Sequence, residues 1–325
     1  MNNKKFLIVL KFVISFSLLA YIINKTDWDR AYQDISNANY YLIVTAFLLN
    51  IFERVELTFK WNLLIRARGI VVSFGRLFLI NAIGTFWGFF LPSSLGTDVV
   101  RGYYLVKNNS EKLVSISSIF VDRFLGLLSL TIIASVAITL SSHTISGIDL
   151  KIVLYLISAG MLAAFYLLQN ERSSKWFTSL LTRIRFKKVV TPVIKLHQSI
   201  LEYKNHKEVL WYSFTINFIV QLTRIMIYYF IAIAFGISIP FFYFVLFIPV
   251  IMIVLLIPIS IGGLGVREGT FIAFFASVGV PVQDAVVITF TNTIINTTNT
   301  MLGGLVYLFY NNSPKETEPL LNNTK

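Results

Sequence analysis

The chain has 325 residues, of which 56% are hydrophobic and only 14% charged, and its mean hydropathy is +0.72. A soluble domain carries about a quarter of its residues as charges, so this composition excludes an ordinary soluble protein and indicates an all-α polytopic membrane protein. The absence of cysteine excludes disulfides and thiolate chemistry. The net charge of +12 is also found in nucleic-acid-binding proteins, but in a membrane protein it is typical of basic cytoplasmic loops, so we expect no nucleic-acid partner.

Apolar segments recur from one end of the sequence to the other. The first follows Lys4 and Lys5, and because no small-x-small cleavage site closes it, we expect a retained span and not a signal peptide. In chain order the segments fall at 6–23, 40–59, 77–91, 114–140, 150–168, 209–235, 241–257, 264–280 and 284–310.

Two places in this series are too short or too tightly spaced for ordinary spans. Segment 77–91 contains Gly84 and Gly88 and is followed by Pro92, and segments 241–257 and 264–280 are separated only by the uncharged stretch PISIGG. Short hydrophobic segments interrupted by Gly and Pro, in corresponding places of two halves, indicate a binding site built from discontinuous helices.

The loops give the orientation. Segments 60–76 and 169–208 are strongly basic and should be cytoplasmic, whereas 141–149 and 236–240 contain no Lys or Arg and should face outward. These loop assignments are consistent with one another only if segment 77–112 is a re-entrant hairpin that enters from the cytoplasm and segment 241–280 is one that enters from the outer face. We therefore expect about six full spans, two re-entrant hairpins, and cytoplasmic N- and C-termini in the cell membrane.

The two interruptions have matching sequences. LPSSLGTDVVR at 91–101 and IPISIGGLGVR at 257–267 keep the same spacing of proline, serine, glycine and arginine, which pairs Pro92 with Pro258, Ser94 with Ser260, Gly96 with Gly262 and Arg101 with Arg267. Hairpins that open to opposite sides predict an inverted repeat. We expect one transmembrane domain at 1–313, with repeats at about 40–140 and 209–310, a basic linker at 169–208 and a polar tail at 314–325.

The chemistry of the tips favours an anionic group. A proline ends one arm, Gly96, Gly262 and Gly263 allow the chain to reverse, and the next helix begins with unpaired N–H groups that attract anions. Arg101 and Arg267 follow closely and are suited to a phosphodiester. Asp98 and Glu268 would either neutralise these arginines or hold a cationic headgroup or a coupling proton.

Polar residues also line one face of each following span. Asp122 and Arg123 belong to a stripe with Ser118, Gly126 and Ser129, and Asn292 and Asn296 belong to one with Asn299 and Gly303. Such stripes line a cavity or form helix-packing contacts. Glu53, Arg54 and Glu56 lie in an earlier span and must face the protein interior, with Arg224 and Gln221 as their counterparts in the second half.

At these motifs the sequence resembles the flippase-like family that includes the transmembrane region of lysylphosphatidylglycerol synthases. The matching stretches are LPSSLGTDVVRGYYL, SSIFVDRFLGLLSL, PISIGGLGVREGTF and ASVGVP. The resemblance extends over roughly 5–310 and implies a polytopic protein that translocates phospholipids, including aminoacylated phosphatidylglycerol, between leaflets. It places functional marks at Pro92, Gly96, Asp98, Arg101, Asp122, Arg123, Gly262, Gly263, Arg267 and Glu268. Because the sequence ends in a short polar tail without the soluble transferase domain of the synthases, synthase activity is not expected.

Three functions remain open at this point. The first is a phospholipid flippase, which needs no cofactor or metal, has membrane phospholipids as its partners and could act beside a separate lipid-modifying enzyme. The second is a membrane-embedded transferase, for which Asp27-x-Asp29 is a weak metal-binding pattern. The third is a small-solute secondary transporter, since inverted repeats serve these as well. No catalytic motif is present, so we expect no enzyme.

Overall fold

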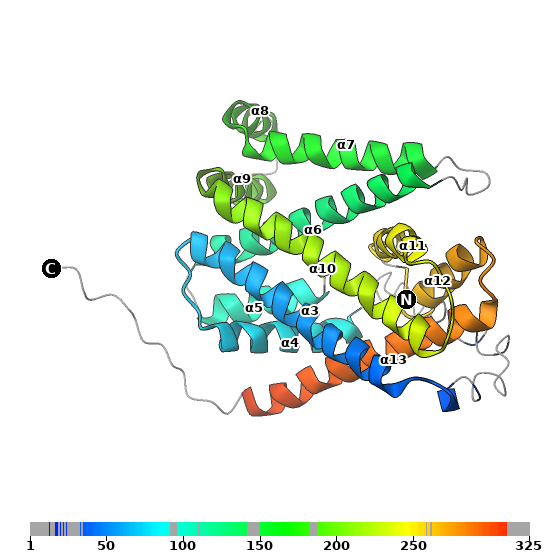
Figure 1. Cartoon of the computed structure of the whole chain (residues 1–325). Helices are drawn as coiled ribbons and strands as arrows, with labels where there is room; N and C mark the ends of the chain where they lie inside the picture. The colour runs from blue at the N-terminus through cyan, green and yellow to red at the C-terminus, as the bar shows by residue number, and fades with distance from the viewer. Residues whose placement is uncertain are drawn as a thin grey trace.

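The computed structural model describes residues 35–91, 96–108, 111–141, 150–182, 187–257, 259–260 and 262–310, with a few single residues nearer the N-terminus. Across these residues the structure is almost entirely helical and contains no β-strand (Figure 1). Most of the first predicted span lies outside the described residues, as do Pro92, Ser94, Pro258, Asp27, Asp29 and the polar tail.

The helices follow the apolar segments of the sequence closely. In chain order they are α3 (Tyr40–Ala67), α4 (Phe74–Phe90), α5 (Gly96–Asn108), α6 (Lys112–Leu140), α7 (Leu150–Gln169), α8 (Glu171–Thr182), α9 (Lys187–Leu201), the 3-10 turn Glu202–His206, α10 (Lys207–Ala234), α11 (Phe241–Val254), α12 (Val266–Ala276) and α13 (Val282–Tyr310).

The prediction that segment 60–76 is a loop is wrong for its first half, because α3 continues to Ala67. Trp61, Leu64 and Ile65 are fully buried there, so packing extends the helix past the end of the apolar run. The helix ends at Ala67, just before Gly69, which has a positive φ of 79°. This conformation lets Ile70 N donate to Ile65 O at 3.0 Å, which closes the last turn. Lys60 is therefore an interior residue and not a loop residue.

Helices α3 and α10 form an antiparallel pair at the centre of the molecule (Figure 1). Asn39, the N-cap of α3, donates its backbone N–H to Ala234 O at the far end of α10, at 2.7 Å. Further along, Lys60 Nζ donates to Asn217 Oδ1 at 2.7 Å. Because buried polar groups must be paired, these contacts fix the register between the two helices.

Helices α4 and α5 form the first hairpin. Glycines spaced four apart allow close packing of membrane helices, and here a Cβ added to Gly84 would lie 2.6 Å from Arg101 Cγ, while one added to Gly88 would lie 2.6 Å from Thr97 N. Since the earlier glycine faces the later residue of α5, the two helices run antiparallel. The turn between them, at 92–95, lies outside the described residues.

We expect Gly88→Ala to destabilise the protein by about 1–2 kcal/mol, because overpacking costs about 1–3 kcal/mol and the better helix propensity of alanine returns about 0.5–1. The new methyl group would meet the backbone of Thr97, which cannot rotate away. Gly160→Ala in α7 is the matched control, since nothing lies within 4 Å of its added Cβ. Thermal unfolding in detergent measures both; equal melting temperatures would contradict the close packing.

Helices α11 and α12 form the second hairpin. Phe247 on α11 packs against Phe274 and Phe275 on α12, with ring centroids 5.4 and 5.3 Å apart. At the other end, a Cβ added to Gly263 would lie 3.3 Å from Leu255. Gly262, Gly263 and Gly265 all have positive φ, a conformation that favours glycine, and they let the chain reverse before α12 begins.

The two halves of the bundle have matching helix lengths. Helices α3 to α6 contain 28, 17, 13 and 29 residues, and α10 to α13 contain 28, 14, 11 and 29. The packing is also reciprocal: α4 lies against α13, and α11 lies against α6. At about 1.5 Å per residue the hairpin helices are about 17–26 Å long, shorter than the hydrocarbon core of about 30 Å.

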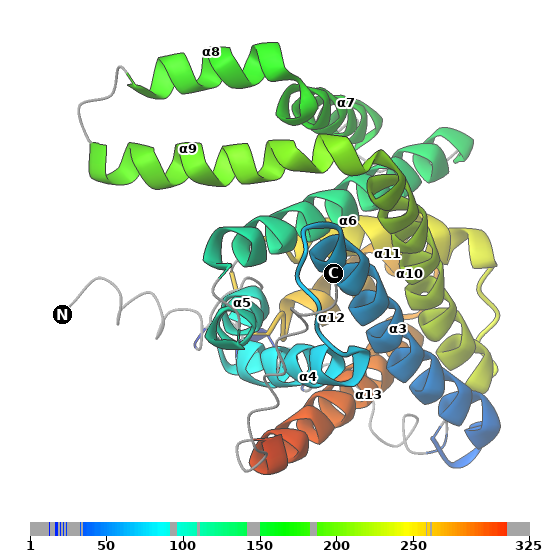
Figure 2. The same cartoon turned by 90° about the vertical axis from the view of Figure 1, so that its left-hand side faces the viewer.

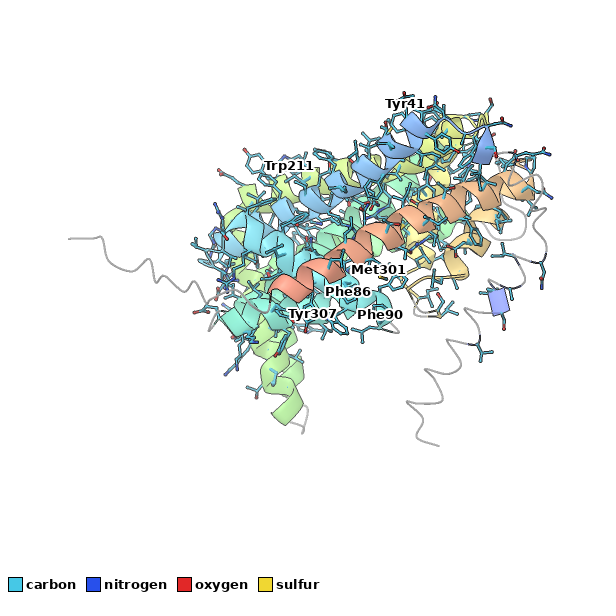
Figure 3. All side chains as sticks on the ribbon, turned by 90° about the horizontal axis from the view of Figure 1, so that it is seen from below. Tyr41, Phe86, Phe90, Trp211, Met301 and Tyr307 are labelled. Atoms are coloured by element: carbon cyan, nitrogen blue, oxygen red, sulfur yellow. The ribbon has the colours of Figure 1, made fainter. Side chains whose placement is uncertain are left out.

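The outer surface is apolar. Among the described residues, three stretches are long and apolar enough to cross a membrane, at Lys112–Leu140, Lys151–Gln169 and within Val190–Ala234. Only 11% of the apolar stretch in α7 is buried within the protein. This helix lies with α8 and α9 to one side of the bundle (Figure 2). Figure 3 shows further aromatic side chains on the exterior, including Tyr41 and Trp211. Tyr41 lies near the start of α3, and Trp211 lies near the start of α10. An apolar exterior of this extent is typical of a surface that contacts the membrane.

Candidate functional site

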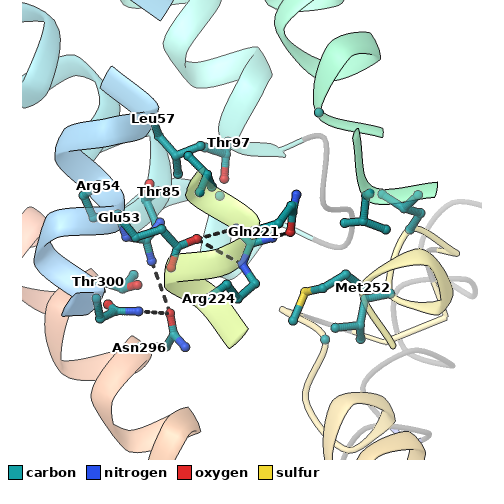
Figure 4. Close-up of a pocket in the computed structure, with 18 of the residues that line it drawn as sticks. Glu53, Arg54, Leu57, Thr85, Thr97, Gln221, Arg224, Met252, Asn296 and Thr300 are labelled. Carbon is teal, nitrogen blue, oxygen red and sulfur yellow. Dashed lines mark hydrogen bonds and ion pairs between the residues drawn. The ribbon is translucent and has the colours of Figure 1, made fainter. Parts of the chain in front are cut away.

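A polar cavity of about 380 Å³ lies between the two hairpins and the long helices. Its wall includes side chains from α3, α4, α5, α6, α10, α12 and α13, several of which are drawn in Figure 4. The volume is within the range of small-molecule sites. Among the described residues, its charged lining consists of the basic residues Arg54, Lys60, Arg101, Arg123, Arg224 and Arg267 and the acidic residues Glu53 and Asp122, which leaves a formal net charge of +4.

One buried ion network joins α3, α5 and α6 at this cavity. Lys60 Nζ lies 2.9 Å from Asp122 Oδ1, and Arg101 Nη2 lies 3.4 Å from Asp122 Oδ2. Arg101 also reaches Asp98 Oδ1 at 3.3 Å, and Arg123 Nε donates to the other oxygen of Asp98 at 2.5 Å. Two carboxylates thus connect three cations, which is how charges are tolerated in a low-dielectric interior.

Packing holds Arg101 in this network. Its guanidinium lies over the ring of Trp61, 4.1 Å from the centroid, and its aliphatic stem lies against Gly84 of α4. Trp61 is itself fixed by donating Nε1–H to Ser118 Oγ at 3.2 Å. Only 5% of Arg101 is exposed, and its Nε has no hydrogen-bond partner among the described residues.

A second network crosses between α3 and α10. Arg224 donates to Glu53 through Nε at 3.0 Å and through Nη2, and it also contacts Gln221 (Figure 4). The sequence predicted that Glu53, Arg54 and Glu56 face the interior, and the structure confirms this placement for Glu53 and Glu56, which are 5% and 7% exposed. Glu56 accepts a hydrogen bond from Thr223 Oγ1 at 3.1 Å.

Asparagines connect α3 to α13 on the next side of the cavity. Asn50 donates to Asn296 Oδ1 at 3.1 Å and accepts from Asn299 at 2.7 Å, while Asn292 donates to the hydroxyl of Tyr228 at 2.8 Å. Arg54 Nη2 also donates to Asn296 Oδ1, at 3.4 Å (Figure 4). The polar stripe on α13 therefore has both of the roles considered from the sequence. Asn292 and Asn296 line the cavity, and Asn292, Asn296 and Asn299 form hydrogen bonds to neighbouring helices.

The second hairpin contributes Arg267 and Glu268, which have different surroundings. Arg267 lines the cavity half-buried, and within the described part of the chain it donates only to the carbonyl of Gly262, at 3.4 Å. Glu268 is fully buried and accepts from the backbone N–H of Gly265 at 2.7 Å and from Thr293 Oγ1 at 2.5 Å. It caps α12, so a carboxylate of the chain already occupies the positive end of that helix.

The turn of the second hairpin lies against the end of α4 beside the cavity. A Cβ added to Gly262 would lie 3.4 Å from the carbonyl oxygen of Phe89, at the end of α4. Ser260, Gly262 and Gly263 line the cavity. Of the other predicted site residues, Asp98 lies behind Arg101 and Arg123, Gly96 packs against Leu91, and Pro92, Ser94 and Pro258 lie outside the described residues.

Several residues of this site were not predicted from the sequence, among them Lys60, Trp61 and Asn217. Lys60 was placed in a loop because the apolar run ends just before it. Its position seven residues after Glu53 puts both side chains on the same face of one helix, and this spacing was the available signal. No local feature of the sequence pairs Asn217 with Lys60.

Comparisons with known proteins agree with the resemblance. A family model described as the lysylphosphatidylglycerol synthase TM region matches residues 8–304. A UPF0104 membrane protein of Methanothermobacter thermautotrophicus is 25% identical over 86% of this chain and 87% of its own length. A second one from the same organism is 22% identical over 82% and 84%, and one from Methanocaldococcus jannaschii is 29% identical over 37% and 35%. No solved structure matches.

Proposed function

The chain belongs to the membrane protein family described as the lysylphosphatidylglycerol synthase TM region, and from that premise we propose that it moves phospholipids between the leaflets of a cell membrane. The observation that carries the proposal is the charged cavity enclosed by two hairpins inside an apolar bundle. Moving a charged headgroup through hydrocarbon unassisted costs several kcal/mol or more, and fixed charges and amides along a cavity wall offset that desolvation.

The helix lengths support re-entrant hairpins in this proposal. Helices α4, α5, α11 and α12 fall short of the hydrocarbon thickness, so each pair enters and returns on one side while its tip lies near the cavity. Backbone that breaks at such a depth is tolerated where it lines a wet site. The reciprocal packing of α4 on α13 and of α11 on α6 is what an inverted repeat predicts.

The inverted repeat supplies a mechanism of alternating access. A hairpin that opens toward the cytoplasm and one that opens toward the outer face can each expose the cavity to one leaflet, while the acyl chains stay in lipid beside the apolar exterior. In this proposal the basic segment 169–208 lies at the cytoplasmic surface, because cytoplasmic segments are enriched in Lys and Arg, and both termini are cytoplasmic as well.

The proposal predicts that purified protein in liposomes speeds the exchange of acyl-labelled phospholipids between leaflets, measured by the fraction that an impermeant quencher reaches with time. Empty liposomes, and liposomes holding an unrelated polytopic protein, are the controls. Rates equal to these controls across anionic, zwitterionic and aminoacylated lipids would exclude the function. Uptake of a soluble solute without lipid exchange would instead favour a secondary transporter.

A further inference from the structure

We propose that the cavity selects headgroups of net negative charge and rejects cationic ones, with Arg54 and Arg267 as the groups that hold the anion. This inference rests on the proposed function and names its substrate class. The family description mentions lysylphosphatidylglycerol, an aminoacylated and cationic lipid, whereas we propose a headgroup of the opposite charge. The reasons lie in which charges of the cavity are already paired.

The carboxylates of the cavity wall are occupied. Glu53 accepts two hydrogen bonds from Arg224, and Asp122 is paired with both Lys60 and Arg101. Just behind the wall, Asp98 is paired with Arg101 and Arg123. A cationic headgroup would have to displace one of these internal cations, leaving it buried without a counter-charge, which is strongly unfavourable.

Two guanidinium groups of the wall have no such partner. Among the described residues, neither Arg54 nor Arg267 lies within 4.0 Å of a carboxylate oxygen; Arg54 contacts the amide of Asn296, and Arg267 contacts the carbonyl of Gly262. Both hydrogen bonds are long, at 3.4 Å. A guanidinium has five donors, so most of their donors remain available to a ligand.

The remaining features of the cavity point to the same ligand. Among the described residues, the buried Nε–H of Arg101 has no acceptor, and the cavity wall carries six basic side chains against two acidic ones. Arginine forks match the paired oxygens of a phosphodiester. Rejection of cations then follows from like-charge repulsion, which is a common source of binding specificity.

The test measures leaflet exchange of four acyl-labelled lipids in the same proteoliposomes: phosphatidylglycerol, phosphatidylethanolamine, phosphatidylcholine and lysylphosphatidylglycerol. We expect phosphatidylglycerol to exchange fastest and lysylphosphatidylglycerol at least about 100-fold more slowly, because placing like charges together costs several kcal/mol. Exchange of the lysyl lipid at the same rate as phosphatidylglycerol, or faster, would overturn the charge selection while leaving the proposed function intact.

If no lipid exchanges, the proposed function fails, and anion binding is then decided on the detergent-solubilised protein. Inorganic phosphate or glycerol 1-phosphate should raise the melting temperature of the wild type and not that of the double variant Arg54→Gln with Arg267→Gln. Arg68→Gln is the matched control, because Arg68 lies away from the cavity and pairs with Glu202. No stabilisation of the wild type would overturn the anion site. Accumulation of phosphate inside proteoliposomes would identify a free anion and not a lipid as the ligand, overturning the lipid assignment.

Discussion

Replacing Asp122 by asparagine is expected to lower the free energy of unfolding by about 3–5 kcal/mol, because removing one partner from a buried ion pair leaves uncompensated charge. Asp122 is 4% exposed and is paired with both Lys60 and Arg101. The amide has nearly the same size as the carboxylate, so the change acts on charge and leaves packing intact. Thermal or denaturant unfolding in detergent measures the loss.

A pair with an exposed carboxylate is the control for this experiment. Glu202 is paired with Arg68, whose side chain is 9% exposed, but the side chain of Glu202 is 59% exposed and stays hydrated, and pairs that water reaches are worth about 0–1 kcal/mol. Glu202→Gln should therefore change stability little. Arg101 keeps its pair with Asp98 in this variant, whereas Lys60 has no other carboxylate partner among the described residues, so adding Lys60→Met to Asp122→Asn should recover part of the loss. A loss for Asp122→Asn no larger than that of Glu202→Gln would mean that water reaches this network.

The sequence predicts the helices well because each has a simple physical signal. The apolar run at 114–140 becomes α6 at Lys112–Leu140, and the short runs near 77–91 and 241–257 become the hairpin helices α4 and α11. Hydrophobic length and glycine or proline interruptions are local features, so a single sequence contains them. The amphipathic helices α8 and α9 were less clear, since a basic linker and a surface helix have similar composition.

The partners within the site could not be predicted in the same way. The spacing of motifs predicts that Arg101 and Arg267 share one site, but it does not show that Arg101 is paired twice while no described carboxylate lies within 4.0 Å of Arg267. The two partners of Arg101 are Asp98 on the same helix and Asp122 on α6. Similarly, the sequence offered Glu268 as a binding or pairing residue, and only the fold shows it against Gly265 N and Thr293.

Arg267→Ala is expected to reduce phospholipid exchange by roughly 10- to 100-fold while leaving stability nearly unchanged. A hydrogen bond to a charged group is worth about 1.5–3 kcal/mol, and about 1.4 kcal/mol corresponds to a factor of ten in rate. Arg267 lines the cavity, and its loss frees no described carboxylate. The variant should therefore unfold close to the wild-type temperature, in contrast to Asp122→Asn.

Comparison with Arg267→Lys separates the charge from its geometry. Lysine retains the positive charge but is a point donor that cannot fork onto two oxygens, so its exchange rate should fall between those of the wild type and the alanine variant. Arg68→Ala serves as the arginine control, since it removes the same charge from a pair with Glu202 outside the cavity, and it should not slow exchange. Wild-type exchange by Arg267→Ala, with normal expression, would show that the headgroup does not depend on this arginine and would contradict its assigned role.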